Sequence, residues 1–419
     1  MSLKRFLWRN VIQYGGTLRS ENHGVLIILH AMRNWLVGLV AVVLCMSQSC
    51  RPYTNEAQDC PTTTPPTASA IDSSLLSLSD SVEVWLDSMQ MSNGLVETSY
   101  QSNLASLYDN ALSATAFLST GRVEEARSIL AFFNQRLNTE MLVGTGGYFQ
   151  FRNASGPQGN RWLGDNAWLL IAIHNYEHVT GDYQFAAMRD ALDAWIRAQQ
   201  DVDGGLWGGT DATGATIGKV TEGIIDAFNA VQGFDAFHEG VLMYLEQQRW
   251  DTAEQLLVSW PGSNYYYALD NFSWGYCTFE GIPNRMLDDA DRFLNVQLHA
   301  PNQRYVTGYC FDEDRDAVWM EGTAQMAVAY TKAGNSERAN SILQEVANTR
   351  LTQSGWSGAR GIPYATNQGT GYGGGLLWDG IDTQPATAAS TWFIMACNSF
   401  DPMQVNYVKA IPDSLRFWQ

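Results

Sequence analysis

The chain repeats one unit, a helix with one polar face followed by a helix that is apolar all round. Apolar residues recur at three- and four-residue spacing in segments 74–89, 123–137, 185–200 and 337–351, with charged residues between them. This pattern is typical of helices with one face in water. Alanine-rich segments with almost no charge alternate with them, at 110–120, 166–176, 223–234, 322–330 and 386–396. Helices that are apolar all round are buried, so the sequence predicts an all-α body of paired helices.

Each predicted buried helix starts beside an acidic residue. The starts are Asp109-Asn110, Asp165-Asn166, Glu222-Gly223, Asp270-Asn271 and Glu321-Gly322, and a sixth is predicted at Gln384-Pro385, after Asp382. Proline is common at the first position of a helix. Subtraction of residue numbers places successive acids 48 to 61 residues apart. This period is longer than the roughly 34 to 47 residues of the common two-helix solenoid repeats.

Six such pairs resemble the six-hairpin glycosidase superfamily, whose fold is an (α/α)6 toroid. The stretches RWLGDNAW (161–168), VWMEGTAQ (318–325) and GIPYATNQGTGYG (361–373) are similar to bacterial members, and the resemblance covers about residues 73–400. It implies six inner helices wrapped by six outer helices, in one domain over 73–419, and a carbohydrate as substrate. It does not point to a hydrolase family with a defined catalytic pair.

Inner helices that run in the same direction would bring the acids at their starts to one mouth. An acid at a helix N-terminus can simply stabilise free N–H groups and the helix dipole, by about 0.3–1 kcal/mol. Five acids at one mouth exceed that need, and burial near like charges raises a carboxyl pKa, as a general acid beside a base requires. The predicted catalytic pair is Asp165 and Glu321, because Trp162 and Trp319 flank them. Glu222 and Asp109 are predicted to tune or orient this pair.

Aromatic residues are frequent in and beside the predicted loops, where binding residues concentrate. The predicted sugar-stacking residues are Tyr108, Trp162, Trp207, Trp274, Trp319, Tyr364 and Trp378, and Arg161 is predicted to hold a hydroxyl or a carboxylate. Simple packing of the loops explains the same aromatics equally well. Trp168 and Trp392 lie inside predicted buried helices and are expected in the core.

The first fifty residues read as a leader. The apolar run WLVGLVAVVLCM follows Arg33 and ends shortly before Cys50. It is short for a membrane span and typical of a bacterial secretory signal peptide, in which Cys50 would be the lipidated residue of a lipoprotein. Plain secretion and a membrane anchor are the alternatives, and the true start is Met1 or Met32.

Residues 51–72, rich in threonine and proline, would tether the body to an outer or plasma membrane surface, in the periplasm or on the cell surface. In such an exported body Cys277 and Cys310 either pair or remain buried thiols.

Three motifs suggest a cofactor or a metal, and each lacks the context it needs. His174, Glu177 and His178 match a zinc-protease pattern, but at the end of a helix and without a third ligand. Asp312, Asp314 and Asp316 open like a calcium loop that then lacks its glycine and its glutamate. Gly369, Gly371 and Gly374 spell a dinucleotide motif with no strand before it. The sequence therefore predicts no metal and no cofactor.

The negative net charge argues against some classes of binding partner. The net charge is −18, and the first fifty residues hold five basic residues against one acidic, so the body is more acidic still. Such a body repels nucleic acid and makes a polyanionic substrate unfavourable. The sequence thus predicts a glycoside hydrolase acting on a neutral or weakly charged glycan. The alternatives are a non-catalytic glycan-binding lipoprotein, and a polysaccharide lyase or sugar epimerase on the same scaffold.

Overall fold

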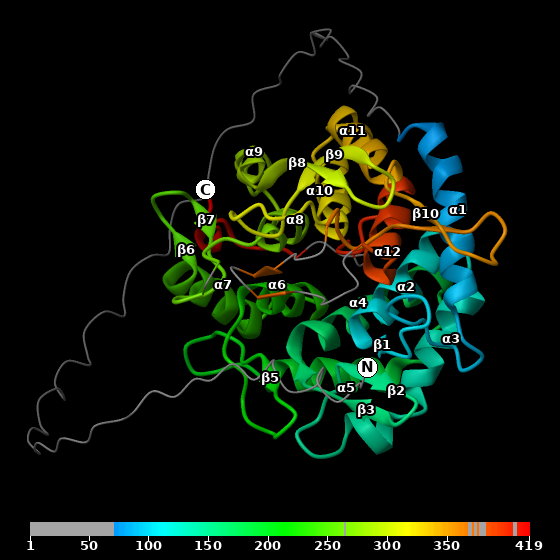
Figure 1. Ribbon diagram of the computed structural model, residues 1–419. Coiled ribbons are helices and arrows are strands. Elements are labelled where there is room, and N and C mark those ends of the chain that lie inside the picture. The colour runs from blue at the N-terminus through cyan, green and yellow to red at the C-terminus, as the bar shows by residue number, and fades with distance from the viewer. Residues whose placement is uncertain (1–70, 264, 368–370, 373–374, 377–382, 405–408) are drawn as a thin grey trace, which may run out of the picture. The chain divides into compact units, whose positions relative to one another are not determined.

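Inner and outer helices alternate along the chain and form two concentric rings (Figure 1). The computed structural model describes residues 71–419 except 264, 368–370, 373–374, 377–382 and 405–408. The inner helices are α2 (Leu107–Ser119), α4 (Leu163–Thr180), α6 (Thr221–Ala230), α8 (Leu269–Thr278), α10 (Met320–Lys332) and α12 (Thr387–Cys397). The outer helices are α1 (Ser73–Met89), α3 (Val123–Asn134), α5 (Ala186–Arg197), α7 (Ala236–Gln248), α9 (Arg285–Asp289) and α11 (Ser336–Ala347). Each inner helix packs against the next, and α12 packs against α2, which closes the ring.

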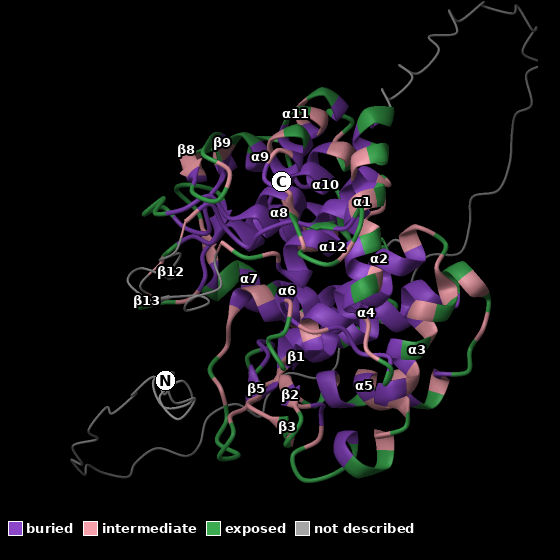
Figure 2. Cartoon of the chain, turned by 45° about the vertical axis from the view of Figure 1, so that its right-hand side comes forward, coloured by how far each residue is buried: buried purple, intermediate pink, exposed green. Residues whose placement is uncertain are grey.

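Burial explains why the two kinds of helix differ in composition. In α5 only Met188, Leu192, Trp195 and Ile196 are buried, and they lie three and four residues apart. In α12 every residue from Thr387 to Cys397 is buried. Figure 2 shows the same contrast, with buried residues along the inner helices and exposed residues on the outer ones. The predicted alternation of exposed and buried helices is confirmed.

Six backbone hydrogen bonds link the starts of the inner helices. The first residue of each inner helix donates its N–H to a carbonyl in the loop that leads to the next inner helix, at 2.8–3.3 Å. The donor and acceptor pairs are Leu107 to Gln150, Leu163 to Gly208, Thr221 to Ser259, Leu269 to Phe311, Met320 to Tyr364 and Thr387 to Thr98. Each bond satisfies one of the N–H groups that a helix start leaves free. The inner helices therefore all start on one face, called here the N-terminal face.

The asparagines of two Asp-Asn pairs fasten the loops of this face. The Asn110 side chain accepts from Val96 N–H at 2.8 Å and donates to the carbonyls of Val96 and Ser106 at 3.0 and 2.7 Å. Asn166 makes the same three bonds, with Tyr148 N–H, Tyr148 O and Trp162 O at 2.8–3.1 Å. The repeated Asp-Asn pair thus has two functions, because the asparagine holds the loop while the aspartate enters the ring.

The strands are short antiparallel pairs in the loops, apart from one longer hairpin. The short strands are β1 (Ala105–Ser106), β2 (Phe151–Asn153), β3 (Gly156–Gln158), β4 (Arg161–Trp162), β5 (Gly209–Thr210), β6 (Trp250–Asp251), β7 (Leu256–Leu257), β10 (Leu351–Thr352), β11 (Arg360–Gly361), β12 (Gly371–Tyr372) and β13 (Gly375–Leu376). The hairpin β8 (Leu294–His299) with β9 (Arg304–Tyr309) pairs six residues on each side. The sequence predicted an all-α body, so this hairpin was missed.

The sixth inner helix starts later than the sequence predicted. It begins at Thr387 rather than at Gln384-Pro385, because Pro385 and Ala386 are held in β-bridges before the helix. Pro385 pairs with Pro363 in a β-bridge, and the Gln384 carbonyl accepts from Tyr364 N–H at 3.1 Å. A proline here therefore marks an extended segment before the helix.

The cysteines of the helical body are described by the structure, whereas the predicted leader is not. Cys277, Cys310 and Cys397 are buried free thiols. Of the two alternatives for Cys277 and Cys310, a disulfide or two buried thiols, the structure has the thiols. The leader, Cys50 and most of the 51–72 linker lie outside the described residues. Among the helices that the structure describes, none combines the length and the apolar character needed to cross a membrane.

Candidate active site

Six acidic side chains of the inner helices lie near one another at the N-terminal face. They are Asp109, Asp165, Glu222, Asp226, Asp270 and Glu321, called here the acid ring. Glu222 is half-buried, and the other five are at most 8% exposed. Five of the six were predicted to share one mouth.

Asp226 is the member that the sequence analysis missed. It lies four residues after Glu222 on α6, with 2% of its surface exposed. No start motif marks it, but it is the one charged residue in the apolar segment 223–234 before Asp235 at its boundary. A carboxyl in the middle of a buried helix needs a reason, and this could have identified it.

Helix capping does not explain the acid ring. All five predicted acids lie within the first turn of their helices, while the cap positions belong to the preceding residues. At α2 the cap bond is made by the Ser106 hydroxyl, which accepts from Asp109 N–H at 2.8 Å. One carboxyl oxygen each of Asp109, Asp165, Glu222, Asp226 and Asp270 has no hydrogen-bond partner among the described residues. Buried polar atoms without a partner are rare and costly, so capping does not account for these oxygens.

Burial raises the pKa of every member of the acid ring. The pKa is raised to about 6 for Asp109, about 7 for Glu222 and about 8 for Glu321. The hydroxyls of Thr98 and Ser106 oppose the rise at Asp109 by favouring its ionised form. At neutral pH Asp109 is mostly ionised while Glu321 is mostly protonated, so an acid and a base coexist.

Repulsion between neighbours adds to the effect of burial and shows which acids lie near each other. Asp109 raises the pKa of both Asp165 and Glu321. Asp270 and Asp165 both raise the pKa of Asp226, and Glu222 and Glu321 both raise that of Asp270. These pairs join the six carboxyls into a closed circuit, in which Asp109 is the neighbour common to the predicted pair.

A hydrogen-bond network fixes the orientation of Glu321. The Tyr108 hydroxyl donates to Glu321 Oε1 at 2.6 Å and accepts from Trp392 Nε1 at 3.2 Å. Gln325 Nε2 also donates to Glu321 Oε1, at 3.4 Å, and its own Oε1 accepts from the Ser273 hydroxyl at 3.0 Å. Four elements, α2, α8, α10 and α12, thus hold one carboxyl.

Aromatic rings surround the acids from within the inner helices. Trp168 is 1% exposed and packs edge-on against Tyr108, Trp274 and Trp392, with centroids 5.5–5.6 Å apart. Trp168 and Trp392 are buried, as expected of core residues, and they also adjoin the acid ring. Trp274 belongs to α8 itself and is 6% exposed.

The other predicted binding residues differ in exposure. Trp162 is half-buried and Trp207 is 38% exposed, with Lys219 Nζ 4.6 Å from the centre of its ring. Trp319 and Tyr364 are buried against each other, with centroids 6.4 Å apart. Trp378 lies outside the described residues.

Arg161 is occupied by its own loop. Its guanidinium donates to the carbonyls of Glu140 and Gly147 and lies over the Phe149 ring, 4.1 Å from its centre. Burial lowers its pKa. These contacts give it a structural role in the loop before α4, and its predicted contact with a ligand stays a prediction.

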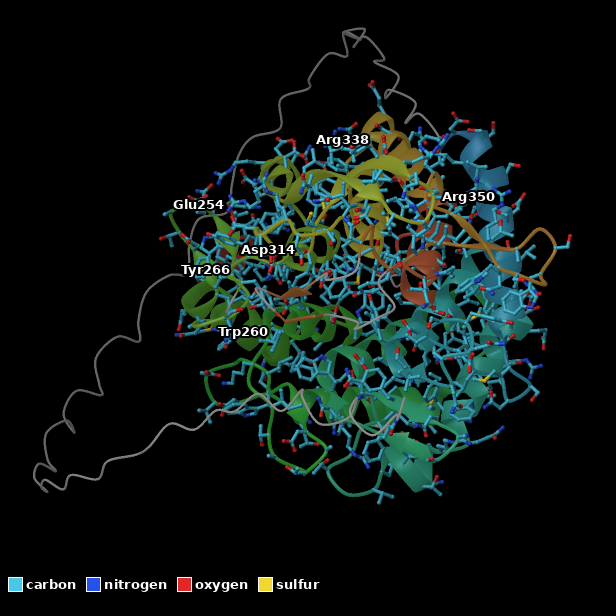
Figure 3. All side chains as sticks on the ribbon, in the orientation of Figure 1. Glu254, Trp260, Tyr266, Asp314, Arg338 and Arg350 are labelled. Carbon is cyan, nitrogen blue, oxygen red and sulfur yellow. The ribbon has the colours of Figure 1, made fainter. Side chains whose placement is uncertain are left out.

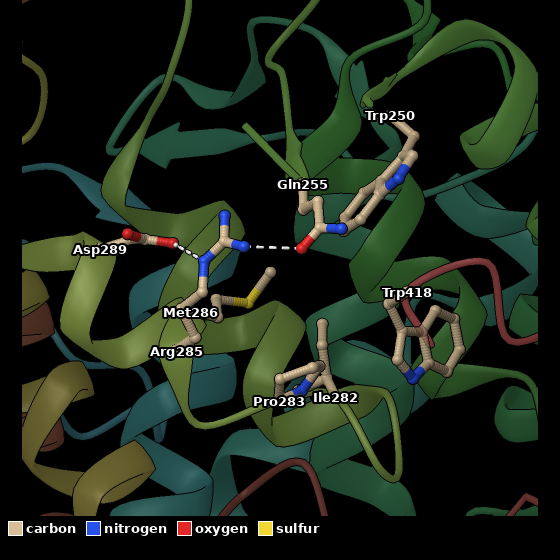
Figure 4. A pocket seen from close by; sticks show the side chains of 8 residues that line it. All are labelled: Trp250, Gln255, Ile282, Pro283, Arg285, Met286, Asp289 and Trp418. Carbon is tan, nitrogen blue, oxygen red and sulfur yellow. Dashed lines mark hydrogen bonds and ion pairs between the residues drawn. The ribbon is translucent and has the colours of Figure 1, made fainter. Parts of the chain in front are cut away.

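The zinc-protease pattern lies at the C-terminal end of α4, whereas Asp165 lies in the first turn of that helix. Gly369 and Gly374 of the glycine motif lie outside the described residues. Glu177 pairs with Arg189 at 2.9 Å, and His178 is exposed near the end of α4. No group of three His, Cys, Asp or Glu in the described part of the chain is arranged to hold a metal ion. A surface hollow lies beyond the end of α8, lined by Trp250, Gln255, Arg285, Met286 and Trp418 among others (Figure 4). No acid-ring residue lines it.

Solved structures match this fold although no protein-family model and no curated protein matches the sequence. A glycosidase variant in complex with glucose has a TM-score of 0.58 at 12% identity, over 79% of this chain and 99% of that chain. A D-mannose isomerase has a TM-score of 0.55 at 10% identity, covering 80% and 98%. A cellobiose 2-epimerase from Bacillus thermoamylovorans has a TM-score of 0.50 at 11% identity, covering 76% and 98%. The chain therefore has the six-hairpin glycosidase-like (α/α)6 fold that its sequence predicted.

Proposed function

We propose that the chain hydrolyses glycosidic bonds in a neutral or weakly charged glycan, with carboxyls of the acid ring as acid and base. The observation that carries this proposal is the acid ring itself, whose pKa values lie on both sides of neutrality. Glycoside hydrolysis requires two carboxyls in different protonation states. Burying a carboxyl group lowers the stability of a fold, so six buried or half-buried carboxyls at one place favour a chemical role for them.

The pKa order assigns the roles within the proposal. Glu321, with a pKa of about 8, is the proton donor, and Asp109, with a pKa of about 6, is the ionised carboxylate. The pKa of Asp165 is raised well above its ordinary value, in the same direction as that of Glu321. Asp109 therefore fits the base better than Asp165 does, although the Asp165–Glu321 pair remains a prediction.

In the proposed reaction Glu321 gives its proton to the glycosidic oxygen as the bond between that oxygen and the anomeric carbon breaks. The anomeric carbon takes a hydroxyl group from water, and the remaining proton of that water ends on Asp109. Proton exchange with solvent then restores both groups. This route, in which Asp109 only deprotonates the water, inverts the anomeric configuration. If Asp109 instead bonds to the anomeric carbon first, water then displaces it, the proton of that water passes to the ionised Glu321, and the configuration is retained.

A sugar isomerase or epimerase is the second candidate, because two matched structures are named as such enzymes. Those reactions move a proton at a carbon next to a carbonyl, and a histidine is the commonest base for such transfers. His174, His178, His238 and His299 are the histidines of the described residues, and none of them perturbs the pKa of an acid-ring member. The carboxyl composition of the site supports hydrolysis.

Export by the leader, with a lipid on Cys50, belongs to the same proposal.

The test is to incubate the purified body with a panel of neutral glycans and to measure new reducing ends. Interconversion of free aldoses and ketoses is followed in the same samples by NMR. Glu321→Gln and Asp109→Asn should each lower turnover by about 10²–10⁴-fold while leaving sugar affinity close to wild type. Interconversion without new reducing ends supports the second candidate. Binding without turnover in any variant, with affinity lost on Trp162→Ala or Trp319→Ala, supports the non-catalytic binder.

A further inference from the structure

The loop that leads into α8 is anchored beside the acid ring. The Ser259 carbonyl accepts from both the N–H and the hydroxyl of Thr221, at 3.3 and 2.5 Å. Thr221 is fully buried and directly precedes Glu222 of the acid ring. Trp260 follows Ser259, so its backbone is fixed close to the Glu222 side of the ring.

Further hydrogen bonds hold other described residues of this loop. Ser259 N–H donates to the Tyr266 carbonyl at 2.9 Å, and Ser263 N–H donates to the Trp260 carbonyl at 3.1 Å. The Tyr267 hydroxyl donates to Asp251 Oδ2 at 3.0 Å. The loop nevertheless leaves aromatic surface uncovered, because Tyr266 is 48% exposed while Trp260 and Tyr265 are half-buried. Figure 3 labels Trp260 and Tyr266 near each other at one side of the molecule.

Aromatic contacts connect this loop to the start of α10. Trp260 packs edge-on against Tyr265 at 5.2 Å, Tyr265 against Phe311 at 5.1 Å, and Phe311 against Trp319 at 5.4 Å between centroids. Trp319 is the cap residue of α10, two positions before Glu321. A series of ring contacts therefore runs from a partly exposed loop to Trp319, two positions before the proton donor of the proposed reaction.

We propose that Trp260, Tyr265 and Tyr266 form an outlying sugar-binding subsite, so that the substrate is a chain of several sugar units. This inference rests on the proposed function and extends it to the substrate class. Rigid, partly exposed aromatic rings bind the apolar faces of sugars with little loss of conformational entropy. Among the described residues no Lys or Arg lies over the ring of Trp260 or Tyr266, whereas Lys219 lies over Trp207. The acidic Asp251 and Glu254 nearby in the chain also favour a neutral unit.

The test compares chain lengths in a neutral oligosaccharide series of the linkage that the panel identifies, from disaccharide to hexasaccharide. Trp260→Ala should lower kcat/KM about tenfold on the longest substrates and leave the shortest unchanged, because only long chains reach the subsite. Calorimetric affinities in the Glu321→Gln background should show the same dependence on length. Trp260→Phe should keep most of the wild-type kcat/KM on long substrates, because it keeps an aromatic ring. Tyr183→Ala is the matched control, because Tyr183 is 62% exposed and lies just after the C-terminal end of α4.

The outcomes separate the two proposals. Hydrolysis by wild type with an equal loss, or no loss, at every chain length in Trp260→Ala overturns the subsite alone. Binding that depends on Trp260 without hydrolysis overturns the reaction and leaves the subsite standing. A glycan that is neither bound nor cut by wild type overturns both. If Trp260→Ala does not fold, as judged by circular dichroism, Tyr266→Ala replaces it with the same expected dependence on length.

Discussion

Removing one hydroxyl should move the alkaline limit of activity upward. The Tyr108 hydroxyl donates to Glu321 Oε1 at 2.6 Å and thereby stabilises the ionised form of that carboxyl. A hydrogen bond to a charged group contributes about 1.5–3 kcal/mol, and one pH unit corresponds to about 1.36 kcal/mol. Tyr108→Phe should therefore raise the pKa of Glu321 from about 8 to between about 9 and 10.

The assay is kcat/KM for release of reducing ends, measured from about pH 5 to about pH 10, since this ratio reports the pKa values of the free enzyme. The alkaline limb should move up with Glu321, because the donor keeps its proton to higher pH. The acid limb near pH 6, set by Asp109, should stay where it is. Tyr148→Phe is the control, because its buried hydroxyl donates to the Phe133 carbonyl at 2.8 Å. It should cost about 1 kcal/mol of stability without moving either limb. An unchanged or lowered alkaline limb in Tyr108→Phe would refute Glu321 as the donor.

Three further results are expected. Because the folded pKa of Glu321 lies above its unfolded value near 4.5, the free energy of unfolding should fall as pH rises from about 4.5 to about 8. Glu321→Gln should remove this fall and raise the free energy of unfolding by at most ~5 kcal/mol at about pH 9. Urea unfolding of both proteins at about pH 4.5 and about pH 9 measures these changes. Glu140→Ala breaks a buried ion pair with Arg152 at 3.1 Å and should cost about 3–5 kcal/mol, whereas Glu124→Ala, at an exposed pair, should cost under about 1 kcal/mol; equal losses would contradict this reasoning. Labelled palmitate should enter the full chain in a bacterial host and not its Cys50→Ala variant, and an unlabelled wild type would exclude the lipid.

The alternation of helices could be predicted because it depends on local information. The spacing of apolar residues within a helix determines whether it has one polar face or none, as α5 and α12 show. Closure of six pairs into a ring followed from the repeat and from a resemblance. The start of α12 could not be placed as well, because the bridge between Pro363 and Pro385 joins segments that sequence periodicity does not connect.

The candidate site was predictable only in part, for a related reason. The acids at helix starts carried a repeated signature, whereas Asp226 carried none and was found only by its burial on α6. The exposure of the aromatics also depends on tertiary packing, which buries Trp319 and leaves Trp260 partly open. Protonation states follow from the number of neighbouring charges and the depth of burial, and neither can be read from spacing.

The central claim is that the carboxyls of the acid ring cleave a glycosidic bond. It is tested most directly by measuring reducing ends released from a neutral glycan by wild type, Asp109→Asn, Glu321→Gln and the exposed-surface control Tyr183→Ala. The account predicts release by wild type and by the control, and a loss of about 10²–10⁴-fold in both acid variants with their affinity for the glycan preserved. Turnover that survives both acid substitutions would contradict it.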